Sequence, residues 1–352
     1  MNYIGSKLSL LDFLYKSIMS IIDNNCNTFC DLFAGTGIVG RYFKSKNFSI
    51  IANDIQYYSY VLNKHYIENH KYLSFKNLDD EIKDLEKADI KEKHLIVCEY
   101  LNNIPYAKGF IYNNYSLGGT KNSDYQRIYF SDENAMKCDA IRIKIEEWFN
   151  NKKINENEYY FLLTSLLENI DKCANTASVY GAFLKDIKKT ALKTFNYYPV
   201  DFFINDIEHQ VYNTDSNKLI ENIKTDILYL DPPYNRRQYS DNYHILETIA
   251  KYDNPKIKGK TGLRNERIRS LYCSKNDVYR AFEDLISKAN TKYIFLSYNN
   301  EGLMSLDDIK TIMSNKGQYG LFVKEYNRFK ADSNRYNAAS TTFEYLHYCI
   351  CF

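Results

Sequence analysis

The chain has 352 residues, 45% of them hydrophobic, and 46 Lys and Arg against 44 Asp and Glu give a formal net charge of +2. This length and apolar content suit one domain with a large insertion, and the small net charge neither favours nor excludes a nucleic-acid partner. No apolar run reaches the roughly 18 residues of a membrane span and the first residues show no signal peptide, so we expect a cytoplasmic protein. The eight scattered cysteines form no Cys-x-x-Cys pair, which predicts reduced thiols and no metal site.

The first sixty residues read as a helix, a strand, a glycine turn, a second helix and a second strand. Leu8 to Ile22 carries apolar residues at helical spacing. The apolar run Thr28 to Phe33 predicts a strand, which leads through a glycine turn into a helix from about Ile38 to Lys46. Ile50 to Ala52 predicts the second strand. Helical patterns then dominate, over residues 80–87, 135–149, 158–170 and 182–195.

Strand signals resume in the second half of the chain. They cover residues 210–213, 227–230, 293–297, 321–326 and 343–352, and the last two read as a hairpin. Seven strand candidates with intervening helices predict a doubly wound α/β sheet. We expect residues 1–60 and 200–352 to form the sheet-bearing domain and residues 61–199 an inserted, mostly helical domain.

The glycine turn matches a nucleotide-binding pattern. Gly35-x-Gly37-x-x-Gly40 follows a predicted strand and opens a helix, and Asp54 lies where a ribose-binding acid is expected. Both features favour an adenosine-containing cofactor, either NAD or S-adenosylmethionine. Asp31 at the start of the turn can face a sulfonium or ammonium group, and no Ser/Tyr-x-x-x-Lys or His relay is placed for hydride transfer. The pattern therefore favours S-adenosylmethionine.

A second motif, Asp231-Pro232-Pro233-Tyr234, ends an apolar stretch. Proline lacks the N–H that a strand ladder needs, so the chain must leave the sheet there. The exit offers a carboxylate, carbonyls held by stiff rings, and an aromatic face, a set that suits a flat substrate with an exocyclic amine. Taken alone, the run is equally typical of an ordinary turn.

Together with Asn2-Tyr3-Ile4-Gly5-Ser6-Lys7 and Asp31 to Gly37, this motif resembles the Dam-like adenine-specific DNA methyltransferases in residue type, order and strand context. The likeness covers residues 1–60 and 200–352. The insertion matches in position only, and its stretch from Gly118 to Arg127 is similar to a restriction-modification subgroup. The resemblance implies a seven-stranded Rossmann-like methyltransferase sheet. It also implies methyl transfer from S-adenosylmethionine to N6 of an adenine flipped out of double-stranded DNA, with a cognate restriction endonuclease as a candidate partner.

The resemblance also implies roles for single residues. Asp231, Pro232, Pro233 and Tyr234 would be catalytic. Tyr3 and Lys7 would hold the methionine end of the cofactor, with Lys7 on its carboxylate. Asp31 would face the amino group of the cofactor and Asp54 its ribose. Asp215 would reach the amine of the cofactor's adenine, with Ser216 beside it. The backbone passing beneath the cofactor would be that of Phe33, Ala34, Gly35, Thr36 and Gly37. Without the motif order, Lys7 and Asp215 read more simply as a solvated helix end and an N-cap.

Candidate DNA contacts rest on residue type and location. Asn122, Gln126 and Arg127 in the insertion are candidates for base readout, and Arg236, Arg237 and Arg264 in loops near the catalytic run are candidates for phosphate contacts. Alternatives are methyl transfer to RNA or to a protein glutamine, an NAD-dependent oxidoreductase, and a DNA-binding module with a dead site. An Asp rather than an Asn at the head of the motif favours DNA. The DNA target sequence and the oligomeric state stay open.

Overall fold

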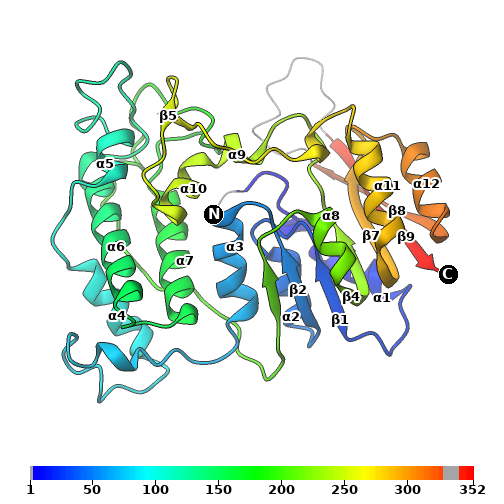
Figure 1. Cartoon of the computed structure of the whole chain (residues 1–352), viewed down its shortest axis with the longest axis horizontal. Helices are drawn as coiled ribbons and strands as arrows, with labels where there is room; N and C mark the ends of the chain where they lie inside the picture. Colours follow the sequence, from blue (N-terminus) through cyan, green and yellow to red (C-terminus); the bar gives the residue numbers. More distant parts are fainter. Residues whose placement is uncertain (1–2, 328–340) are drawn as a thin grey trace. The chain divides into compact units, whose positions relative to one another are not determined.

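A computed structural model describes residues 3–327 and 341–352, so Asn2 of the N-terminal motif lies outside the described residues. The chain divides into two compact units (Figure 1). The sheet unit comprises Gly5–Asn63, Ile207–Gln238 and Ile268–Phe352. The helical unit comprises the residues up to Ile4, then Lys64–Asp206 and Tyr239–Arg267. The last segment follows Asp231–Tyr234 in sequence, within the range that we expected for the sheet-bearing domain.

Within the described residues, the main sheet has seven strands in the order β3-β2-β1-β4-β7-β9-β8. Neighbours from β3 to β7 are parallel, whereas β9 runs antiparallel to both β7 and β8. The doubly wound α/β sheet and the terminal hairpin predicted from the sequence are confirmed. The strand bounds are β1 Thr28–Asp31, β2 Ser49–Asn53, β3 Gln210–Tyr212, β4 Lys224–Leu230, β7 Asn290–Asn299, β8 Gly317–Asn327 and β9 Thr341–Cys351.

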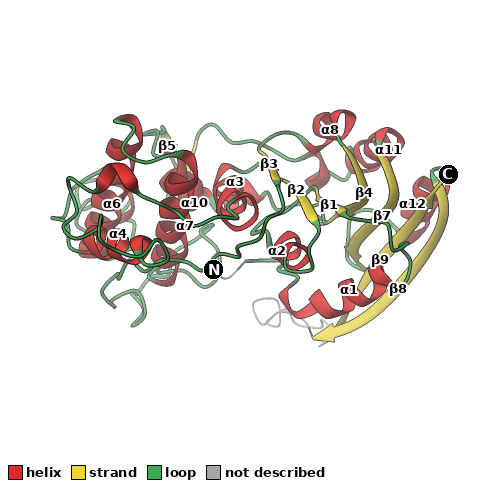
Figure 2. Cartoon of the chain, turned by 90° about the horizontal axis from the view of Figure 1, so that it is seen from below, coloured by secondary structure: helices red, strands yellow, loops and turns green. Residues whose placement is uncertain are grey.

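Helices cover both faces of this sheet, with α1 and α2 on one face and α8, α11 and α12 on the other (Figure 2). The predicted first helix is shorter than expected, because Leu8–Leu10 forms a 3-10 turn ahead of α1. The helix bounds are α1 Leu11–Met19, α2 Ile38–Lys44, α3 Tyr57–Asn63, α8 Ser216–Leu219, α11 Val278–Lys288 and α12 Leu306–Ser314.

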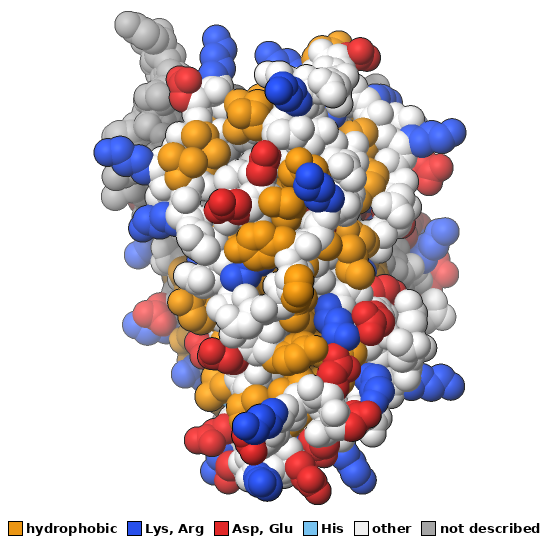
Figure 3. Space-filling model, turned by 90° about the vertical axis from the view of Figure 1, so that its left-hand side faces the viewer, with side chains coloured by type: hydrophobic (Ala, Val, Ile, Leu, Met, Phe, Trp, Pro, Cys, Tyr) orange, Lys and Arg blue, Asp and Glu red, His pale blue; other side chains and the backbone are white. Residues whose placement is uncertain are grey.

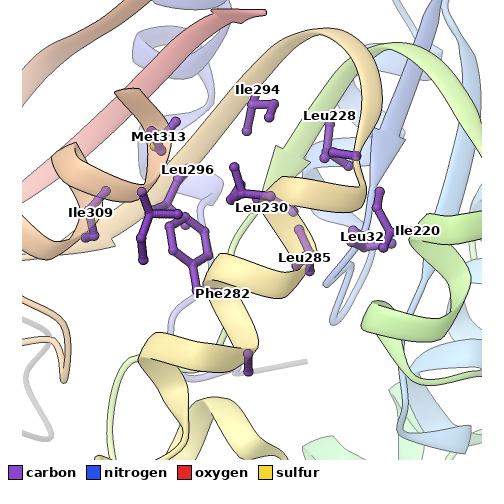
Figure 4. Packing of buried hydrophobic residues seen from close by; sticks show 14 of the residues in the cluster. Leu32, Ile220, Leu228, Leu230, Phe282, Leu285, Ile294, Leu296, Ile309 and Met313 are labelled. Atoms are coloured by element: carbon purple, nitrogen blue, oxygen red, sulfur yellow. The ribbon is translucent and has the colours of Figure 1, made fainter. Parts of the chain in front are cut away.

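The core of the sheet unit lies between strands β4 and β7 and helices α11 and α12 (Figure 4). Leu230 and Leu296 from the strands are fully buried against Phe282 of α11 and Ile309 of α12. Each such side chain stabilises the fold by about 1.5–3 kcal/mol. Because both faces of the parallel strands are covered, β4 and β7 are nearly continuous apolar runs, and this made them visible in the sequence.

The helical unit is built around α6 and α7, whose starts are capped by Ser131 and by the Asn155–Glu158 capping box. Arg142 of α6 is almost fully buried and donates hydrogen bonds to the carbonyls of Ile249 (2.9 Å) and Ala250 (3.1 Å), both in α10. The bounds are α4 Lys93–Asn102, α5 Phe110–Tyr115, α6 Asp132–Asn150, α7 Glu156–Lys172, α9 Tyr239–Asn242 and α10 His244–Lys251, with a π-helical turn Lys64–Glu68, a 3-10 turn Lys76–Leu78 and a hairpin of β5 Ile257–Lys258 and β6 Leu263–Arg264.

Two predicted helices are wrong. Residues 80–87 form turns, interrupted at Asp84, whose φ of 62° lies in the left-handed region. Residues 182–195 are irregular because side chains take the place of helical N–H donors. The Asn134 amide, for example, donates to the carbonyls of Ala191 and Lys193. The hairpin of β5 and β6 lies in a stretch that we expected to be a polar loop.

No helix in the described part of the chain is long and apolar enough to cross a membrane. The cytoplasmic location expected from the sequence stays a prediction.

Candidate active site

The carboxyl ends of three neighbouring strands carry the acidic residues that the sequence singled out. Strand β1 pairs with β2 on one side and β4 on the other, all parallel, and Asp31 is level with Ala52 and Tyr229. Asp31, Asp54 and Asp231 therefore lie at the same end of the sheet, at the carboxyl ends of their strands. The chain proceeds from β1 toward β3 on one side and resumes at β4 on the other, so the strand order reverses between β1 and β4. Open α/β sheets bind their ligands at this point.

The glycine turn is held in a tight shape by Asn63 at the end of α3. Gly35 and Gly37 have φ values of 52° and 74°, which glycine adopts without strain. The Asn63 amide donates to the Gly35 carbonyl (3.0 Å), and a Cβ on Gly37 would lie 2.4 Å from the Asn63 Oδ1 atom. Thr36 lies between the two glycines and Ala34 is buried just before them. Gly37 therefore has no room for a side chain, and the turn keeps its backbone close to Asn63. Sequence reasoning missed Asn63, since no motif marks it.

Asp31 is a buried carboxyl with one acceptor atom left over. It is 1% exposed, its Oδ2 atom accepts the Gly40 N–H (3.1 Å), and its Oδ1 atom is buried without a hydrogen-bond partner in the described residues. Burial raises the pKa of Asp31 to about 8, and the charges of Asp231 and Asp54 add to this rise. An ammonium group at Oδ1 would satisfy the atom and favour the ionised form. This orphaned atom and the glycine turn fit the amino group and the body of S-adenosylmethionine.

The other predicted cofactor residues are partly occupied by local bonds. Asp54 accepts the N–H groups of Gly35 (2.9 Å) and Gln56 (2.8 Å), which ties β2 to the glycine turn. Asp215 caps α8 by accepting from the backbone of the next turn, as the simpler interpretation of the sequence had it, and Ser216 is buried beside it. Phe33 packs edge-on against Tyr272, with ring centroids 4.9 Å apart.

The run Asp231–Tyr234, to which the resemblance gives the catalytic role, begins directly after β4, and Asp231 faces Lys7. The Lys7 Nζ atom lies 3.2 Å from Asp231 Oδ1 and 2.8 Å from Glu344 Oε1. Burial raises the pKa of Asp231 to about 6, while Lys7 lowers it and Glu344 raises it. Lys7 is thus bound to the carboxylates of Asp231 and Glu344 rather than to solvent. The sequence had placed it on the cofactor, a role that stays a prediction.

The ring of Tyr234 is oriented by the strand next to β4. It packs edge-on against Tyr298 of β7, with centroids 6.2 Å apart, and its carbonyl accepts the Leu303 N–H (3.1 Å). The Lys7 ammonium lies 5.8 Å from the ring centroid. Pro232 is buried and Pro233 is half-buried between the acid and the ring. A rigid aromatic face thus follows the carboxylate within three residues.

Tyr3 is described within the helical unit. Its ring stacks on Tyr243 at 4.7 Å, and the neighbouring Ile4 N–H donates to the Tyr243 hydroxyl (2.8 Å). The pairing of Tyr3 with Lys7 on the cofactor stays a prediction.

The six candidate DNA contacts fall into an exposed group and a buried group. Asn122 and Gln126 are exposed in one loop, and Arg236 and Arg237 are exposed after the catalytic run. Arg127 is 7% exposed and donates to the carbonyls of Gly259 (3.0 Å), Lys260 (3.2 Å) and Asn114 (3.4 Å).

Arg264 belongs to the buried group, with both terminal nitrogens on Asp253 at 2.8 and 2.6 Å. Direct DNA contact by Arg127 or Arg264 would break these bonds, and the DNA-binding role expected of both side chains stays a prediction. They anchor the β5–β6 hairpin.

The site lies where the strand order of the sheet reverses, and it combines a glycine turn, the carboxylates of Asp31 and Asp231, and a strand that ends at two prolines. This combination defines an S-adenosylmethionine-dependent amino-methyltransferase. Residues 3–312 match the family described as D12 class N6 adenine-specific DNA methyltransferase, and the chain belongs to this family. It is an adenine-specific DNA methyltransferase that uses S-adenosylmethionine as its methyl donor. The expectations of fold, reaction and cofactor are confirmed, and the RNA, glutamine and NAD alternatives are set aside.

Curated relatives agree with this assignment. The chain is 52% identical to Type II methyltransferase M.NlaIII of Neisseria lactamica, over 99% of this chain and 98% of that protein. It is 35% identical to Type II methyltransferase M.CviAII of Paramecium bursaria Chlorella virus 1, over 94% and 93%. Identity to Type II methyltransferase M.FokI of Planomicrobium okeanokoites is 40% over 99% of this chain, which spans about half of that protein (52%).

Proposed function

We propose that Asp231 and the Pro232 carbonyl hold the N6 amine of a flipped-out adenine while the Tyr234 ring stacks on the base. One observation carries this assignment: Asp231 and Asp31 end adjacent parallel strands at the switch point of the sheet. The residues that would hold the amine therefore lie next to the residues that would hold the cofactor. Since the N6 lone pair is delocalised into the ring, two fixed acceptors on its N–H groups favour a pyramidal nitrogen that can attack.

Residues at the carboxyl ends of the strands would each bind a different part of the cofactor. Asp31 would bind its amino group, the backbone of Phe33 to Gly37 would pass beneath it, and Asp54 would accept the ribose hydroxyls. Asp215 and Ser216 would meet the adenine ring. When bound, S-adenosylmethionine supplies an electrophilic methyl group on a sulfonium. The protein would position the two reactants, exclude water from them and provide fixed charges and dipoles around them.

Asp231 also suits the proton that the amine must lose. Methyl transfer would form an N–C bond as the bond between the methyl group and the sulfonium sulfur breaks, and it would leave the nitrogen with one proton too many. Burial raises the pKa of Asp231 to about 6, so the carboxylate can accept this proton and release it to solvent near neutral pH. A freely solvated Asp, with a pKa of about 4, would be a weaker base.

The test is methyl transfer by Asp231→Ala with labelled S-adenosylmethionine and DNA of varied sequence, read by sequencing of modified adenines. We expect turnover to fall by a factor of about a thousand or more while cofactor binding stays measurable. Tyr234→Ala should weaken both base binding and turnover by roughly tenfold or more. Asp307→Ala, an exposed acid of the same unit, is the matched control. Normal turnover in Asp231→Ala would overturn the assignment.

We also infer that the helical unit selects the DNA target. Its loop at Asn122 and Gln126 is exposed and carries side chains suited to base edges. Arg236 and Arg237 of the sheet unit would contact phosphates, so binding should weaken steeply with salt. The face of the protein in Figure 3 mixes acidic and basic side chains around a hydrophobic centre, and such a face lacks the single-sign charge of a phosphate-binding surface.

The names of the relatives support a place in a type II restriction-modification system, with a restriction endonuclease that cleaves the same DNA sequence. An endonuclease that is blocked by DNA modified with this enzyme would identify that partner. Cleavage unaffected by the modification would exclude the candidate endonuclease.

A further inference from the structure

An acidic residue outside the sequence motifs lies in the catalytic charge cluster. Glu344 is in β9, opposite Asn299 of β7, and is 1% exposed. Its Oε1 atom accepts from Lys7 Nζ (2.8 Å) and from the hydroxyl of Ser297. The same Lys7 ammonium reaches Asp231 at 3.2 Å. One buried cation thus bridges the catalytic carboxylate and a carboxylate two strands away in the sheet.

This arrangement is demanding for a protein to maintain. Lys7 is 4% exposed, and a buried ammonium is stable only with partners that compensate for lost hydration. Asp231 alone would pair with Lys7, yet a long flexible side chain with one partner can adopt several rotamers. Glu344 provides the second partner, and Ser297 of the adjacent strand fixes that partner in turn. The bond lengths rank Glu344 as the closer anchor.

We propose that Glu344 is a positioning residue for Asp231: it anchors Lys7 so that the ammonium orients the catalytic carboxylate while leaving it able to accept the N–H groups of adenine. The proposal rests on the assignment of Asp231 to catalysis. Glu344 touches neither adenine nor the reacting methyl group in this account, and it acts through Lys7.

The sign of the electrostatic effect follows from the groups around Asp231. They are Lys7 ahead of the first 3-10 turn, Asp31 of β1, Tyr229 of β4, Tyr234 of the catalytic run and Glu344 of β9. Lys7 favours the ionised form of Asp231, whereas Glu344 opposes it and shares the Lys7 charge. Removing the charge of Glu344 therefore lowers the pKa of Asp231. It also leaves Lys7 to bind Asp231 alone, which makes that carboxylate a weaker acceptor for the substrate.

The test compares Glu344→Gln with wild type in steady-state methylation from pH 5 to pH 9. We expect kcat to fall about tenfold or more and the acid limb of the kcat profile to move to lower pH. Cofactor affinity, measured by equilibrium binding, should change less than about twofold. A merely structural role would lower the fraction of active enzyme without moving the limb. Glu325→Gln, an exposed Glu of the neighbouring strand β8, is the matched control.

Two further variants make every outcome decisive. Glu344→Asp keeps the charge but withdraws it from Lys7, so it should fall between wild type and Glu344→Gln in both readouts. If Glu344→Gln does not fold, this variant decides the question alone. An unchanged kcat and acid limb in a folded Glu344 variant overturns the proposal. If Asp231→Ala also retains turnover, the proposed function itself has failed, whereas an inactive Asp231→Ala confines the failure to Glu344.

Discussion

Asp31 is a buried acid whose ionisation destabilises the folded protein without a cofactor. The raised pKa, about 8, means that the folded state holds a proton on Asp31 which the unfolded state releases near pH 4. The contribution of Asp31 to the free energy of unfolding is therefore fully present below pH 4 and is lost as the pH rises toward 8. A bound ammonium group would reverse this preference, since it favours the charged carboxylate.

We expect Asp31→Asn to be at least as stable as the wild type above pH 8 without cofactor, because the substituted side chain has no charge to bury. Its free energy of unfolding should vary less with pH between 4 and 8, although Asp231 leaves some dependence. Cofactor affinity should fall roughly tenfold to a hundredfold with the loss of a charge-assisted bond. Denaturant titrations at several pH values measure the first effect and equilibrium binding the second. Equal pH dependence in both proteins would refute the buried-charge account; Asp307→Asn is the control.

At the level of single elements, the sequence predicted the strands far better than the helical unit. The strands β1, β4 and β7 are covered on both faces, so apolar runs and the glycine and proline exits marked them. Residues 182–195 have a helical pattern, but the buried Asn134 amide binds their carbonyls, a long-range contact that no local pattern reports. Glu344 and Asn63 were missed for the same reason. Each is a polar residue whose partner lies far away in sequence.

Arg127, predicted from the sequence to read bases, is buried and supports the β5–β6 hairpin. Arg127 binds the carbonyls of Gly259 and Lys260 at the hairpin tip, and Tyr115 donates to the Gly262 carbonyl (2.8 Å). Gly262 has a φ of 67°, and a Cβ there would approach the Tyr115 ring at 2.8 Å. A rigid tip with an exposed Lys260 results. Under the proposal that the helical unit selects the DNA target, we expect this lysine to contact a phosphate.

Arg127→Gln should leave the tip carbonyls underbonded and destabilise the enzyme by about 1–3 kcal/mol. DNA affinity should drop while cofactor affinity stays the same, because the hairpin belongs to the helical unit. Lys260→Gln is the partner variant: it removes the tip charge without touching the anchor, so it should reduce the salt dependence of DNA binding and leave stability unchanged. Intact DNA binding in both variants would show that the hairpin has no part in recognition.

For the whole molecule, the division into units changes what a specificity swap must contain. The expected insertion, residues 61–199, lacks the segment Tyr239–Arg267, which the structure assigns to the helical unit. Arg142 joins α6 to α10 through the Ile249 and Ala250 carbonyls, and Arg264 closes on Asp253 within the same segment. Target choice and this second segment should therefore be inherited together.

A chimera tests this inheritance. Replacing residues 64–206 and 239–267 with those of a D12 relative that methylates another DNA sequence should give a folded enzyme with the donor's target. Replacing residues 61–199 alone should leave Arg142 and its α10 partners mismatched. That chimera should unfold at lower denaturant concentration and methylate weakly, since a buried arginine that loses its acceptors costs about 1–3 kcal/mol or more. Sequencing of modified adenines identifies the target in each case. If the two-segment chimera folds but keeps the original target, base recognition lies in the sheet unit, where Arg236 and Arg237 would be the residues to examine.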